Sequence, residues 1–254
     1  MQIQSIVRLT SGFLLCLTTY AIAIAQNLES DPNLVVVISG FGSDPSPKQL
    51  SKESPRGQGN SGMYQLTGEL TKAGFETRFF NWNGTDAGKI TQDDAAGADG
   101  IASFIRDQNS AKHLKHIILI GHSWGGHTML EVAEKLQVEP PLNVSLAIGV
   151  DPSSLSRGER MKILPSTIQS FVNYHTHNAF VWGRWKDDDR VQNVDLGDPS
   201  GSFGENNRRN YAARFDITAH NAAEWDKLIH VDIIQRIKNV LAAPKSRALN
   251  YEDK

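Results

Sequence analysis

The sequence predicts an α/β protein, with a mostly parallel central sheet of about six strands flanked by helices. Short apolar runs, rich in β-branched residues, are typical of strands buried on both faces of a sheet. These runs alternate along the chain with segments that have helical periodicity. Such alternation favours parallel strands joined by right-handed crossovers. The chain has 254 residues, 39% hydrophobic and 21% charged, which is an ordinary globular composition and favours one domain.

Each expected element follows from its local pattern. Strands are predicted where apolar or aromatic runs are bounded by turn residues, at 34–38, 76–82, 116–120, 144–150, 168–174 and 214–218. Helices are predicted from apolar spacing over 64–73, 94–106 and 125–136. Asn221 and Glu224 fit a capping box that would begin a last helix. That helix would place Trp225, Ile229, Ile233, Ile237 and Val240 on one stripe.

The first 25 residues have the layout of a secretory signal peptide. Arg8 precedes an uncharged apolar run that ends in small residues, with an Ala-x-Ala site before Gln26. A retained membrane anchor is the alternative, but the strongly apolar part is short and is interrupted by polar residues. We therefore expect a secreted or periplasmic protein with one domain over 26–254 and no stable membrane span after signal removal.

Charge and cysteine content argue against a nucleic-acid-binding protein and against a disulfide-stabilised one. The net charge of −2 becomes −3 when the segment containing Arg8 is removed, and no basic cluster remains, so a nucleic-acid partner is not expected. Cys16, the only cysteine, lies in the predicted signal, so stability must come from the core and not from disulfides. Residues 182–213 are polar, with too few apolar side chains for a second core, and are expected to form a long excursion from the domain.

The most informative segment is Gly121-His122-Ser123-Trp124-Gly125, which lies between the predicted strand 116–120 and the predicted helix 125–136. A serine in so tight a turn adopts strained backbone angles, and glycines two positions away on either side leave room for the turn. The turn holds the hydroxyl above the sheet, where the helix N-terminus favours negative charge. The alternative is a glycine-rich turn whose serine only caps the helix.

This segment, together with Gly126 and the downstream Gly149-Val150-Asp151-Pro152, resembles the α/β-hydrolase superfamily and especially its lipase and esterase branches. The resemblance covers the order of elements from about 34 to 241, although only the serine turn is highly specific. It implies a serine hydrolase with Ser123 as nucleophile and with its acid and its base following in that order along the chain.

Asp151 meets the requirement for the acid because it directly follows the strand 144–150. An Asp that only caps the following turn is the alternative. After the next strand the chain offers Asn173, His175 and His177 but no carboxylate. The base is expected to be His220, just ahead of the last helix, with His230 inside that helix as the alternative.

The resemblance also implies an oxyanion hole made by the backbone N–H groups of Phe41 and Trp124. Phe41 lies in Ser39-Gly40-Phe41-Gly42, which could equally be only a turn. His175 and His177 form a His-x-His pair that could line the pocket or bind a metal, but the sequence shows no third ligand. No metal or cofactor is therefore expected.

The predicted reaction is hydrolysis of a small-molecule or lipid-like carboxylic ester, of the carboxylesterase or lipase type, through an acyl-enzyme intermediate. The long excursion is charged and unlike an apolar lipase lid, which favours soluble or modestly acylated esters. The same three residues would also serve an amidase, a thioesterase or a polymer-ester hydrolase. An exported binding protein that has lost catalysis is the remaining alternative. The sequence does not indicate an oligomeric state.

Overall fold

The computed structural model describes residues 32–41, 61–82, 97–154, 163–186, 188–201, 203, 211–215 and 217–243. All of these lie within one compact unit, residues 32–254. The predicted signal peptide and its cleavage site lie outside the described residues, as does Gly42, so export remains a prediction. Among the described residues, no helix has the length and apolar character needed to cross a bilayer.

Six strands form one sheet in which every neighbouring pair is parallel, in the order β2-β1-β3-β4-β5-β6. The strands are β1 (Asn33–Ile38), β2 (Thr77–Phe80), β3 (His116–His122), β4 (Leu146–Val150), β5 (Phe171–His175) and β6 (Val191–Asp195). The predicted fold class, a parallel sheet of about six strands flanked by helices, is confirmed.

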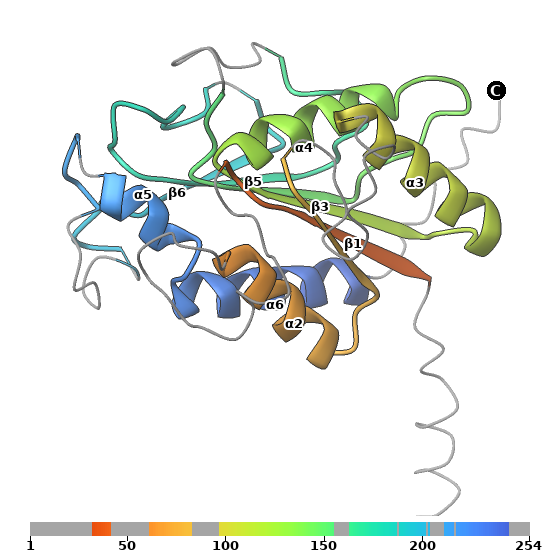
Figure 1. Cartoon of the computed structure of the whole chain (residues 1–254), viewed down its shortest axis with the longest axis horizontal. Helices are drawn as coiled ribbons and strands as arrows, with labels where there is room; N and C mark the ends of the chain where they lie inside the picture. Colours follow the sequence, from red (N-terminus) through yellow and green to blue (C-terminus); the bar gives the residue numbers. More distant parts are fainter. Residues whose placement is uncertain are drawn as a thin grey trace, which may run out of the picture. The chain divides into compact units, whose positions relative to one another are not determined.

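Helices cover both faces of the sheet (Figure 1). One face packs against α2 (Gly62–Lys72), α5 (Ile217–Ala223) and α6 (Lys227–Ala242), and the other against α3 (Gly97–Lys112) and α4 (Trp124–Lys135). Alternate residues of β1 point into the two cores: Val35 and Val37 into the first, Val36 and Ile38 into the second. Burial on both faces explains why this strand has a continuous apolar sequence.

Three predictions near the C-terminus are wrong. The described residues of 214–218 do not form a strand, because Arg214 and Phe215 lie in a turn and α5 begins at Ile217. The sixth strand is β6, inside the segment predicted to be a polar excursion. Asn221 lies within α5 and caps nothing, whereas Asp226 is the N-cap of α6, its side chain accepting a hydrogen bond of 2.9 Å from the N–H of Leu228.

The carboxyl ends of the parallel strands meet at one edge of the sheet, where α/β proteins place their ligand sites. Strands β3, β4 and β5 end there in sequence, so the next residue of each, Ser123, Asp151 and Thr176, begins a loop at this edge. Residues far apart along the chain are thereby brought to one place.

Candidate active site

Ser123 occupies a sharp turn between β3 and α4. Its φ of 53° and ψ of −125° lie in a region that residues with a side chain rarely adopt. A Cβ at Gly121 would lie 2.3 Å from the carbonyl oxygen of Gly125, and one at Gly125 would lie 2.4 Å from that of Ile38. The chain can therefore turn this tightly only with glycine on both sides of the serine.

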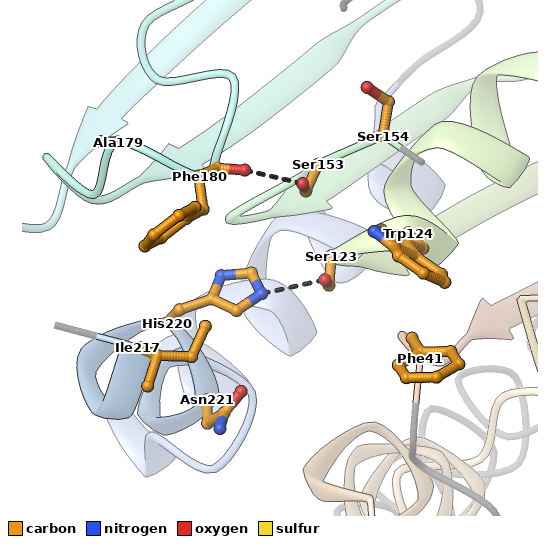
Figure 2. A pocket seen from close by; sticks show the side chains of 10 residues that line it. All are labelled: Phe41, Ser123, Trp124, Ser153, Ser154, Ala179, Phe180, Ile217, His220 and Asn221. Atoms are coloured by element: carbon orange, nitrogen blue, oxygen red, sulfur yellow. Dashed lines mark hydrogen bonds between the residues drawn. The ribbon is translucent and has the colours of Figure 1, made fainter. Parts of the chain in front are cut away.

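Ser123, His220 and Asp151 form a continuous chain of hydrogen bonds. The His220 Nε2 atom is 2.9 Å from Ser123 Oγ, a contact drawn as a dashed line in Figure 2, and Nδ1 is 2.7 Å from Asp151 Oδ2. Because an ionised carboxylate can only accept, Nδ1 donates to Asp151, which leaves the Nε2 lone pair facing the serine hydroxyl. All three residues are buried. This arrangement can remove a proton from the hydroxyl.

Thr176 orients Asp151. Its backbone N–H donates to Asp151 Oδ1 at 2.8 Å, and its hydroxyl donates to Oδ2 at 2.9 Å. The backbone N–H of Asp151 donates to the carbonyl oxygen of Tyr174 at 2.7 Å. Sequence reasoning did not find Thr176, whose only signal is its position directly after β5.

His122 stacks against the candidate base. Its ring lies 4.8 Å from that of His220, centroid to centroid, at 29°, and its Nε2 is 3.2 Å from the His220 carbonyl oxygen. Burial, followed by repulsion from His220, holds the pKa of His122 well below its usual value. His122 is therefore neutral, and its 3.8 Å approach to Glu224 is not an ion pair.

Glu224 directly follows α5, and its buried carboxyl group contacts Ser61, the N-cap of α2. It accepts a hydrogen bond of 3.0 Å from the hydroxyl of Ser61. Burial raises the pKa of Glu224 to about 7, although the hydrogen bonds from Ser61 and from the backbone of Met63 and Gly62 act in the opposite direction. The group therefore titrates near neutral pH, close behind the hydrogen-bonded chain.

His230, the alternative base, forms its hydrogen bonds with groups other than Ser123. Its Nδ1 is 2.9 Å from Glu69 Oε2, and its Nε2 is 2.7 Å from the carbonyl oxygen of Glu224. The hydrogen bond from His230, followed by that from Lys227, outweighs burial and lowers the pKa of Glu69 to about 2. Both ring nitrogens of His230 thus face hydrogen-bond acceptors, and neither is bonded to a hydroxyl that could give up a proton.

A cavity of about 590 Å³ opens over the serine and is drawn in Figure 2. Ser123, His220, Phe41 and Trp124 all line it. As the first residue of α4, Trp124 has a backbone N–H without an acceptor in its own helix. The rings of Phe41 and Trp124 are 4.5 Å apart, centroid to centroid. The residues proposed for the oxyanion hole therefore lie on the same cavity as the serine.

The His-x-His pair lies beside this region and has a third neighbour. His175, His177 and Asp195 each offer a ligand atom within 4.8 Å of the other two. Sequence reasoning missed Asp195 because it ends β6, the strand that was not predicted. Among the described residues, these side chains are the group with a donor set suited to a metal.

Comparisons with known proteins give structural matches only. No protein-family model matches the chain, and no curated protein matches it. The chain is similar to MenH from S. aureus, at 20% identity over 54% of this chain and 42% of that one, with a TM-score of 0.33. It therefore spans less than half the length of MenH.

Two other matches extend over most of both chains. The chain is similar to a cutinase-like protein from Cryptococcus sp., at 16% identity over 84% of this chain and 97% of that one, with a TM-score of 0.40. It is also similar to a dienelactone hydrolase-like promiscuous phosphotriesterase from metagenomic libraries, at 16% identity over 84% and 89%, with a TM-score of 0.41. Since these three scores are below 0.5, the fold is assigned from this chain's own geometry. Its parallel six-stranded sheet, with a strained serine between β3 and α4, gives it the α/β-hydrolase fold.

Proposed function

We propose that this chain is a serine hydrolase that cleaves carboxylic esters, with Ser123 as nucleophile, His220 as base and Asp151 as the acid that orients it. The observation that carries the proposal is the continuous hydrogen-bonded chain from the Asp151 carboxylate through both His220 nitrogens to Ser123 Oγ. A serine hydroxyl is a weak nucleophile until such a base accepts its proton.

The reaction follows from these contacts. Ser123 Oγ attacks the ester carbonyl carbon while its proton moves to His220 Nε2, and Asp151 stabilises the imidazolium. The oxygen that becomes negatively charged accepts hydrogen bonds from the backbone N–H groups of Trp124 and Phe41. His220 then gives its proton to the departing alcohol, which leaves an acyl-serine. Water, deprotonated by His220, attacks this acyl group and releases the acid, and the proton returns to Ser123.

The cavity wall supports an apolar substrate group. Phe41, Trp124, Phe180 and Ile217 face the cavity in Figure 2 and present aromatic or aliphatic side chains. Burying an apolar acyl or alcohol group against them would yield about 25 cal/mol per Å² of apolar surface. A small-molecule or lipid-like ester fits this wall. Because of the predicted signal peptide, we expect the proposed enzyme to act outside the cytoplasm.

The test is the hydrolysis of p-nitrophenyl esters of increasing chain length by the wild type and by Ser123→Ala. We expect kcat/KM to fall by about 10⁴-fold or more in the variant, because no other group forms the acyl intermediate. A fluorophosphonate probe should label the wild type at Ser123 and leave the variant unlabelled.

Ser153→Ala is the matched control. Ser153 lines the same cavity, but its hydroxyl donates to the Phe180 carbonyl oxygen at 2.8 Å, as drawn in Figure 2, and not to a histidine. This variant should keep both labelling and turnover. Ester hydrolysis by Ser123→Ala at the wild-type rate would refute the proposal. Amide and thioester substrates assayed in parallel identify the preferred bond.

A further inference from the structure

Three side chains that the proposed hydrolysis does not use gather at the end of the β5–β6 pair. His175 ends β5, His177 follows two residues later, and Asp195 ends β6. One ligand atom from each lies within 4.8 Å of the other two. Two imidazoles and one carboxylate form a donor set that suits Zn²⁺ and related divalent transition metals.

The backbone holds the two strand ends together. His175 pairs with Asp195 in the parallel register of β5 and β6, and the N–H of Leu196 donates to the His175 carbonyl oxygen at 2.9 Å. The N–H of Gly197 donates to Asp195 Oδ1 at 2.8 Å. The Cα positions of His175 and Asp195 are therefore set by the sheet and not by their side chains, and His177 follows two residues after β5.

The surroundings of the His175 side chain point to a ligand. The residue is only 5% exposed, and its Nδ1 atom has no hydrogen-bond partner in the part of the chain that the structure describes. A buried polar atom without a partner is costly, and such atoms in proteins usually have a specific reason.

The other two side chains can adjust. His177 Nε2 lies 2.9 Å and 3.0 Å from the two Asp195 carboxylate oxygens, and the two side chains are 42% and 38% exposed. A zinc ion needs bonds of about 2.0–2.2 Å to each ligand. If the exposed side chains of His177 and Asp195 rotate toward the His175 ring, one ion can reach all three ligand atoms at these bond lengths. Water would take the fourth position.

We propose that His175, His177 and Asp195 bind one divalent transition-metal ion, best matched by Zn²⁺, that joins the edge strand β6 to the end of β5. Thr176, which donates two hydrogen bonds to Asp151, lies between the two histidines. The metal would therefore stabilise the loop that carries these donors. It does not contact the reacting atoms.

The experiment uses the full chain without an affinity tag, stripped of metal with a chelator and then dialysed. Titration with ZnCl₂ by calorimetry should show one ion per chain. The midpoint of thermal unfolding should rise by about 5 °C when free zinc is ~100 times its Kd. Co²⁺ in place of Zn²⁺ should give the intense visible absorption of a four-coordinate site.

Asp195→Asn and His177→Gln should each weaken zinc binding by about tenfold or more, because each removes one of three ligands. His113→Asn is the control: His113 is exposed and has a φ of 53°, which asparagine tolerates, so zinc binding should be unchanged. Circular dichroism checks that each variant is folded.

Two results would overturn the proposal: no zinc binding by the wild type, which leaves only a His177–Asp195 hydrogen bond, or undiminished binding in both ligand variants. The readouts do not depend on hydrolysis. Ser123→Ala protein should bind zinc as the wild type does, so the metal site and the proposed esterase activity can fail separately.

Discussion

Helices α5 and α6 each bury one histidine with hydrogen bonds at both ring nitrogens, yet the two rings differ in what they can do. His220, in the seven-residue α5, donates to a carboxylate through Nδ1 and faces a hydroxyl on an open cavity through Nε2. His230, in the sixteen-residue α6, faces a carboxylate and a backbone carbonyl, both of which only accept. Burial and hydrogen bonding are thus the same for both, and the difference lies in the second partner. A base needs a partner that can give up a proton, whereas His230 connects α6 to Glu69 of α2.

The largest expected effect comes from substituting each of these histidines in turn. His220→Ala should lower kcat/KM by about 10⁴-fold or more, because the proton acceptor is lost. His230→Gln should leave kcat/KM within about threefold of the wild type and reduce the free energy of unfolding by ~1–3 kcal/mol, because it disrupts buried hydrogen bonds. Ester hydrolysis and urea unfolding measure the two effects. A large loss of turnover with an unchanged fold in His230→Gln would reverse the assignment.

Glu224 contacts the surroundings of both histidines: its carbonyl oxygen accepts from His230, and its side chain lies 3.8 Å from His122, which stacks on His220. Its pKa in the folded protein, about 7, is above its ordinary value of 4.5. Between these two pH values the folded state holds a proton that the unfolded state has released. This group therefore makes stability fall as pH rises through that window, by about 3 kcal/mol in total.

Glu224→Gln should remove this contribution, so the stability of the variant relative to the wild type should improve from pH 4.5 to pH 7. Urea unfolding across that range measures the difference. His122 has a lowered pKa and contributes a slope of opposite sign in both proteins, which is why the variant is compared with the wild type at each pH. A constant difference across the range would show that Glu224 does not titrate there.

The smallest expected effect concerns how His220 is held in place. Thr176→Val removes the hydroxyl that donates to Asp151 Oδ2 at 2.9 Å but keeps the backbone donor. We expect kcat for ester hydrolysis to fall by about tenfold, with KM little changed, because one hydrogen bond to a charged group is worth about 1.5–3 kcal/mol. Thr176→Ser should restore activity. Equal activity in the Val and Ser variants would limit Thr176 to a structural role.

The parts that the sequence predicts well are those whose pattern is local. The turn at Ser123 requires glycine on both sides, and β1, β3 and β4 are continuous apolar runs because they are buried on both faces. Each of these features can be recognised from a few consecutive residues. The parallel centre of the sheet and the edge at which Ser123 and Asp151 lie follow from them.

The parts that the sequence does not predict depend on distant partners. Strand β6 is an edge strand with half-buried, largely polar residues, so it lacks the apolar signal of its neighbours. In contrast, Phe215 and Ile217 gave a false strand signal: they are apolar yet 75% and 51% exposed, and Ile217 lines the cavity. Glu224 resembled a capping residue, but its side chain contacts Ser61, 163 positions earlier.

The spacing of the hydrogen-bonded chain has a consequence for how the protein matures. His220 meets Ser123 across 97 positions and Asp151 across 69, so no fragment that begins after β3 or ends before α5 can assemble these contacts. An extended polypeptide would be chemically silent, as the predicted export of an unfolded chain would require. During refolding, the return of esterase activity would mark the moment at which Ser123, Asp151 and His220 have come together.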